Sequence, residues 1–169
     1  MRKILGVILL MGFAMLASAQ TTLGAWTLLE SIDAITDENK SAIGALASDY
    51  PSLARNSALV IRCSSSSLRP TGVEVFFAAS RYLGSDDFYP IIYRIDRGEP
   101  VSDRWSASTN KEAAFIPAGK EVEFLSAIMS GSELIFRITG YSQDYTYTVP
   151  IHGLNDALYA LGCYKGPAL

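Results

Sequence analysis

The chain has 169 residues, of which 49% are hydrophobic and 18% charged, and its formal net charge is −3. That length suits one domain with a full-sized core. The charges are scattered singly and form no basic stripe, which makes nucleic acids and anionic lipid surfaces poor partners.

The N-terminus has the three-part anatomy of a secretory signal. Arg2 and Lys3 are followed by an uncharged apolar run from Ile4 to Ala17 and by the small-residue sequence Ala17-Ser18-Ala19. The alternative is a membrane anchor, but the run covers 14 residues and a spanning helix needs about 20. We therefore predict a signal peptide over residues 1–19, removed before Gln20, and a single domain over residues 20–169.

Alternation of apolar and polar residues dominates the remaining chain. Short runs rich in β-branched and aromatic residues, separated by Gly, Pro, Ser and Asp, are typical of half-buried antiparallel strands. Five runs predict strands, with Leu59, Ile61 and Cys63 on the core face of the first: Ala58–Cys63, Val73–Phe77, Ile91–Asp96, Leu134–Thr139 and Tyr145–Ile151. Trp26–Leu29 and Ala113–Ile116 are shorter candidates. The pattern predicts a mainly β protein, an antiparallel β-sandwich.

Two segments have helical character. Leu154, Ala157, Leu158 and Leu161 recur at helical spacing, which predicts a C-terminal helix over Gly153–Gly162. The segment from Asp37 to Ala47 is alanine-rich but contains Gly44, and its sequence fits either a helix or a loop.

Cys63 and Cys163 are the only cysteines. In an oxidising compartment an even pair indicates a disulfide, which here would tie the first long strand to the closing helix. The alternatives are two free buried thiols or a metal pair, although two cysteines without suitably spaced histidines make a poor zinc site.

The residues typical of catalysis do not form a recognisable motif. His152 is the only histidine, and no Gly-x-Ser-x-Gly sequence surrounds any serine. The carboxylate pairs Asp86–Asp87 and Asp96–Asp103 lie in turn-rich segments, where acids are usually solvated. Asp33, Asp37 and Glu38 lack the spacing of a calcium-binding loop. We predict no enzymatic activity, no cofactor and no metal.

Arg94, Asp96 and Trp105 are the candidate binding residues. Arg94 and Asp96 are two apart on a predicted strand and therefore point to one face. Trp105 follows a Gly-Pro loop that would bring it alongside, and Trp and Arg are enriched at interface hot spots. The competing interpretation is a polar outer face that only keeps the sheet soluble, with Trp105 in the core.

The order of several short motifs resembles that of the exported VasI/TagO-like proteins associated with type VI secretion, and of related envelope proteins. The motifs are Val60-Ile61-Arg62-Cys63, Val73-Glu74-Val75-Phe76, Tyr93-Arg94-Ile95-Asp96, Arg104-Trp105-Ser106-Ala107-Ser108, Ala113-Ala114-Phe115, Leu134-Ile135-Phe136-Arg137, and Gly153-Leu154 with Ala157-Leu158 running into Cys163. The likeness covers nearly all of residues 20–169. The segment from Asp37 to Ala54 is longer than that family leads us to expect, and Ser64–Ser67 lacks the expected Asn or Asp.

The resemblance implies a small periplasmic accessory protein without a catalytic site. We therefore expect an exported, periplasmic or extracellular protein that binds another envelope protein or a cell-wall component, with the link to type VI secretion resting on the resemblance alone. The alternative is a secreted inhibitor or ligand-binding module that acts on cell-wall components or on wall-degrading enzymes.

Overall fold

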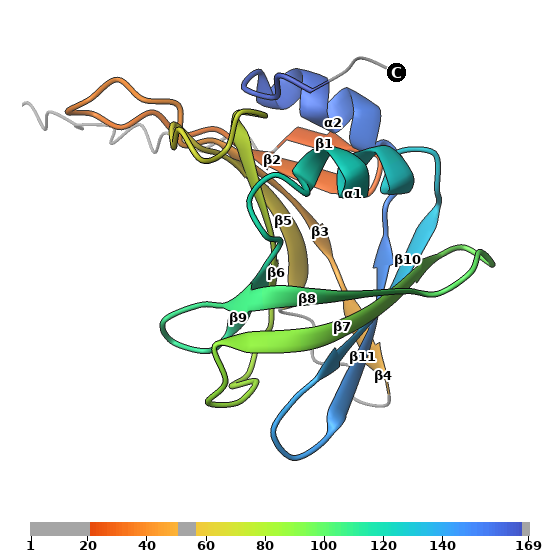
Figure 1. Cartoon of the computed structure of the whole chain (residues 1–169). Coiled ribbons are helices and arrows are strands. Elements are labelled where there is room, and N and C mark those ends of the chain that lie inside the picture. The colour runs from red at the N-terminus through yellow and green to blue at the C-terminus, as the bar shows by residue number, and fades with distance from the viewer. Residues whose placement is uncertain (1–20, 51–56, 167–169) are drawn as a thin grey trace, which may run out of the picture.

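A computed structural model describes residues 21–50 and 57–166 (Figure 1). The predicted signal sequence lies outside the described residues. The strands are β1 (Thr21–Leu23), β2 (Trp26–Leu29), β3 (Ala42–Leu46), β4 (Ser48–Tyr50), β5 (Ala58–Cys63), β6 (Val73–Ala78), β7 (Phe88–Ile95), β8 (Val101–Ala107), β9 (Ala113–Phe115), β10 (Glu133–Thr139) and β11 (Asp144–Pro150). Two helices, α1 (Glu121–Ile128) and α2 (Leu154–Leu161), complete the described elements.

The strands form a single antiparallel sheet that doubles back on itself. Its order is β1-β2-β3-β5-β6-β9-β8-β7-β10-β11-β4. β3 pairs with β2 and β5, whereas β4, which follows it after Ala47, pairs with β11 near the other end of the sheet. The sheet therefore packs as a sandwich that is not closed into a barrel, and β7 and β8 cross in front of β5 and β6 (Figure 1). The predicted mainly β, antiparallel sandwich is confirmed.

Aromatic side chains from both layers meet in the core. The ring of Phe77 on β6 lies 4.9 Å from that of Phe136 and 4.6 Å from that of Tyr147, measured between centroids. These three residues are fully buried. Each of the three residues lies at a core-facing position of its strand, where buried residues alternate with more exposed ones. All seven segments predicted as strands contain strands, and six of them match within one residue at each end, whereas β7 begins three residues before the predicted Ile91.

The C-terminal helix and the disulfide are also confirmed. α2 buries the predicted stripe of Leu154, Ala157, Leu158 and Leu161, and packs on β2 and β3. A glycine in the left-handed region flanks each end, Gly153 (φ 83°) and Gly162 (φ 73°), a backbone conformation that glycine adopts without steric cost. Directly after the helix, Cys163 is bonded to Cys63 at the end of β5, with 5.8 Å between their Cα atoms.

Five elements differ from the sequence predictions, and two of them, the short strands β1 and β4, were not predicted at all. The segment read as a helix or a loop contains strand β3, in which Ile43 and Ala45 are buried and alternate with Gly44. The Gly-Pro loop is present between β7 and β8, but strand β8, which contains Trp105 and pairs with β7, was not predicted. Helix α1 was not predicted, because its buried face includes the charged Glu121. None of the helices in the described ranges is both long and apolar enough to cross a membrane.

Candidate functional site

The outer face of β7 and β10 carries two arginines and two isoleucines in a chequered arrangement. Arg94 lies opposite Ile135, and Ile92 lies opposite Arg137. Tyr93, Phe136 and Ile138, at the intervening positions, point into the core. Strand alternation therefore places all four side chains on the solvent side, where Ile92 is 42% exposed.

These four side chains line a shallow depression of about 320 Å³, together with Tyr93, Pro100 and Thr146. Thr146 on β11 lies opposite Arg137 and accepts a hydrogen bond of 3.2 Å from its Nε. A third arginine, Arg104 on β8, lies opposite Pro90, on the same side of the sheet. We call the surface formed by Ile92, Arg94, Arg104, Ile135 and Arg137 the arginine face.

The three guanidinium groups of the arginine face have no carboxylate partner in the part of the chain that the structure describes. Among the described residues, Arg94, Arg104 and Arg137 form no ion pair, and Arg104 instead stacks over the ring of Phe88 at 5.0 Å. Glu133 and Asp144 lie further along β10 and β11 on the same side, beyond ion-pair distance from them. The guanidinium donors thus remain available to an external anion.

Asp96 has a structural role. It follows the last residue of β7 and has φ 49°, a left-handed conformation that is uncommon outside glycine but is found for aspartate. Its Oδ1 accepts hydrogen bonds from the backbone N–H groups of Ser132 (3.1 Å) and Glu133 (2.9 Å). The carboxylate therefore fixes the start of β10 and does not pair with Arg94.

Trp105 does not lie on the surface, so the prediction that it joins Arg94 in a docking patch is wrong. It is fully buried, with its ring 4.9 Å from Phe136 and 5.5 Å from Phe124 between centroids. The reason is that β8 is a strand opposite β7, where Trp105 faces Tyr89 at an inward position. Of the three candidates, only Arg94 belongs to the arginine face, and its binding role stays a prediction.

Asp103 holds the Trp105 indole through a hydrogen bond. Its carboxylate accepts hydrogen bonds from Lys120 (2.9 Å), from the backbone N–H of Arg104 (2.7 Å) and from Trp105 Nε1 (3.3 Å). Burial raises the pKa of this carboxyl, but the Lys120 ammonium and the other hydrogen bonds outweigh burial and hold the net pKa below its ordinary value.

The other polar candidates do not assemble into a catalytic or metal site. His152 is exposed, and its carbonyl accepts a hydrogen bond from Ala25. Asp87 pairs with Lys111 at 2.9 Å, and Asp103 is held as described above. Within residues 21–50 and 57–166, no group of three or more His, Cys, Asp or Glu side chains is placed to hold a metal ion.

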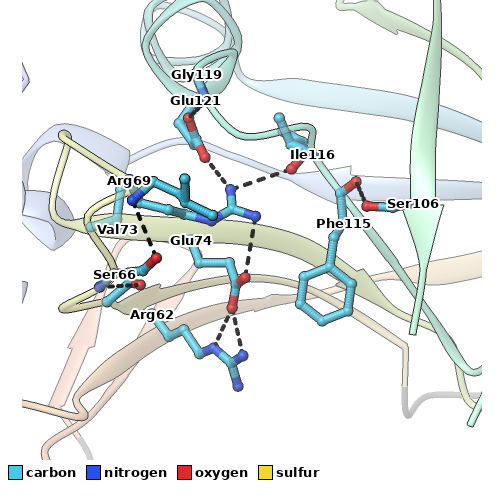
Figure 2. Close-up of polar contacts among 12 residues, drawn as sticks. Arg62, Ser66, Arg69, Val73, Glu74, Ser106, Phe115, Ile116, Gly119 and Glu121 are labelled. Atoms are coloured by element: carbon cyan, nitrogen blue, oxygen red, sulfur yellow. Dashed lines mark hydrogen bonds and ion pairs between the residues drawn. The ribbon is translucent and has the colours of Figure 1, made fainter. Parts of the chain in front are cut away.

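A buried ion cluster, which the sequence did not indicate, lies on the opposite layer (Figure 2). Arg69 bonds to Glu121 at the start of α1 and, at 3.2 Å, to Glu74 on β6. The Glu121 side chain is fully buried and that of Arg69 is 12% exposed. Glu74 also pairs with Arg62 at 2.5 Å. The two buried partners are 52 residues apart in the sequence, so no local pattern could have revealed this cluster of Arg62, Arg69, Glu74 and Glu121.

Comparisons of the chain with family models, with curated proteins and with solved structures found no match. Membership of the VasI/TagO-like family therefore stays a prediction from the motifs.

Proposed function

We propose that this protein is exported, is not an enzyme, and uses the arginine face to bind another component of the cell envelope. The observation that carries the proposal is the pair of unpaired guanidinium groups, Arg94 and Arg137, on either side of the exposed Ile92. Arginine is enriched at interface hot spots, and an exposed apolar side chain beside it is favourably removed from water when a partner binds. The signal-like N-terminus and the disulfide support action in an oxidising compartment.

The link to type VI secretion is the finer part of this proposal. It rests on the resemblance of motifs such as Tyr93-Arg94-Ile95-Asp96 to the VasI/TagO-like proteins. Arg94 is the residue that connects the resemblance with the arginine face.

Site-specific photo-crosslinking in living cells tests this function. A crosslinking amino acid replaces Thr146, inside the depression, and in a control replaces Ala160, exposed on α2. We expect one envelope adduct from position 146, lost when Arg94→Glu and Arg137→Glu are added, and none from position 160. A type VI component in the adduct supports the finer part. Adducts that are equal from both positions, or insensitive to the arginines, contradict the arginine face as the binding surface.

A second candidate function, inhibition of a wall-degrading enzyme, is favoured by the loop between β2 and β3. This loop projects beyond the sheet (Figure 1) and carries Ile35, which is 93% exposed. Asp33 Oδ1 accepts hydrogen bonds from the N–H groups of Ile35 (2.9 Å) and Thr36 (3.0 Å). The loop is therefore ordered before binding, which lowers the entropy cost of inserting it into a cleft.

A lysozyme assay on purified peptidoglycan distinguishes this candidate from the first. Inhibition by the wild-type protein that is lost in Ile35→Asp, and kept in Leu68→Asp, supports insertion of the loop. Leu68 is a matched control because it is also exposed, in a different loop. No effect of the wild-type protein on hydrolysis by lysozymes rejects this function.

A further inference from the structure

The spacing of Arg94 and Arg137 limits what the arginine face can bind. The two residues are diagonal neighbours on adjacent antiparallel strands, since Arg94 lies opposite Ile135 and Arg137 is two residues beyond it. Such diagonal pairs are about 7–8 Å apart. Alternate residues of an extended peptide lie about 7 Å apart on one side of the chain. Carboxylates at positions i and i+2 of an extended segment therefore match the two guanidinium groups.

The isoleucines of the arginine face favour a peptide over other anionic polymers. Ile92 and Ile135 occupy the other diagonal of the chequered arrangement, and both contribute to the depression. A peptide can cover them with the methylene groups of its Glu side chains, whereas a polyphosphate offers no apolar group. A polysaccharide would gain most from an exposed aromatic ring, but Tyr93, which lines the depression, is only 7% exposed, and the exposed ring of Phe88 already carries the Arg104 guanidinium.

The charge of the whole molecule confines an acidic ligand to this surface. The chain carries a formal net charge of −3, so an acidic segment is repelled by most of the surface and attracted where unpaired arginines gather. Each guanidinium can hold a carboxylate through two parallel N–H···O bonds, which an ammonium group cannot do.

From this geometry we infer that the arginine face binds an extended acidic segment of a partner protein, with glutamate or aspartate on alternate residues that all face the arginines. The inference rests on the proposed function and names the chemistry of its partner.

Fluorescence polarisation with a labelled peptide tests the inference. The probe is a capped ten-residue peptide of alternating Glu and Val, added to the purified, disulfide-bonded protein. We expect saturable binding that weakens at least tenfold in the double variant Arg94→Gln and Arg137→Gln. The control variant is Arg97→Gln, at an exposed position just after β7, and we expect it to bind as the wild type does. Lysine keeps the positive charge but lacks the paired donors of arginine. We therefore expect Arg94→Lys to keep less than half of the affinity difference between the wild type and the double glutamine variant.

Two comparisons separate the alternatives. If the isoleucines contribute to binding, a polyphosphate of equal charge displaces the labelled peptide from the protein only poorly. Displacement by polyphosphate that is stronger than displacement by the unlabelled peptide overturns the inference. Equal peptide binding by the wild type and by a double variant with an unchanged circular dichroism spectrum also overturns it. If the peptide does not bind while the adduct from position 146 still depends on the arginines, the acidic-peptide inference fails and the proposed function stands.

Discussion

The arginines of the buried ion cluster and those of the arginine face have opposite surroundings. Arg69 is almost enclosed and reaches two carboxylates, those of Glu74 and Glu121. Arg94 is exposed and reaches none among the described residues. A buried charge without a partner is costly, so the cluster must be complete for the fold to persist. The arginine face has no such requirement, which indicates that its charges serve something outside the chain.

Removal of Glu121 should have the largest effect on stability. Glu121→Ala leaves the Arg69 guanidinium buried without its closest acid, and we expect a loss of about 3–5 kcal/mol in the free energy of unfolding. Urea unfolding followed by circular dichroism measures it. Glu123→Ala is the matched control, because Glu123 lies in the same helical turn but is exposed. Equal effects of the two changes would show that the cluster does not hold the fold.

Loss of the disulfide should rank close behind. The double change Cys63→Ala and Cys163→Ala removes the tie between β5 and α2, and we expect a loss of about 2–5 kcal/mol. Cys63 directly follows Arg62 of the cluster. The double change therefore also measures how much the region of the buried ion cluster contributes to stability. Thermal unfolding with and without reductant checks it: reductant should lower the melting temperature of the wild type and leave that of the variant unchanged.

Arginines of the arginine face should matter little for stability. For Arg94→Ala we expect a change within about 0.5 kcal/mol, because an exposed side chain without a partner leaves nothing unsatisfied when it is removed. The same urea titration measures it beside Glu121→Ala. A loss above 2 kcal/mol would mean that Arg94 has a structural role, and the contrast between the two regions would be lost.

The contribution of Asp103 to stability should depend on pH. Its pKa is lower in the folded protein than in the unfolded chain, so its contribution to stability is present above the unfolded value of about 3.9 and disappears as the pH falls through the folded value. We expect Asp103→Asn to lose less stability than the wild type on acidification from pH 6 to pH 2.5. Parallel acid titrations of the two proteins would refute this if their slopes coincide.

The strands could be predicted because their signal is local. Leu59, Ile61 and Cys63 alternate with solvent-facing residues in the sequence exactly as they do in β5, and the exposure of Arg94 follows from the same rule. Strand β8 was missed because its inward positions include Asp103, whose partner Lys120 is 17 residues away. Helix α1 was missed for a similar reason, since Glu121 is buried only through its contact with Arg69.

The candidate site was predictable only in part. Alternation along β7 placed Arg94 correctly, and the sequence indicated a turn after the strand, but no local pattern shows that the Asp96 carboxylate binds the start of β10, 36 residues away. Arg137 and the isoleucines were not singled out, because their meaning depends on the pairing of β7 with β10. That register joins segments about 40 residues apart and is set by the tertiary structure.

The passage of the chain from β3 to β4 through Ala47 has a consequence for the order of folding. Among the described strands β4 pairs with β11 alone, and Ser48 and Thr148 in this pair are separated by 100 residues. The hairpins β5–β6, β7–β8 and β10–β11 can form early because their strands are close in sequence. β4 can pair only after β11, which lies near the C-terminal end of the chain, has been positioned. We expect slow refolding, with the pairing of β4 and β11 among the last events, and until then both edges stay open to pairing with other chains.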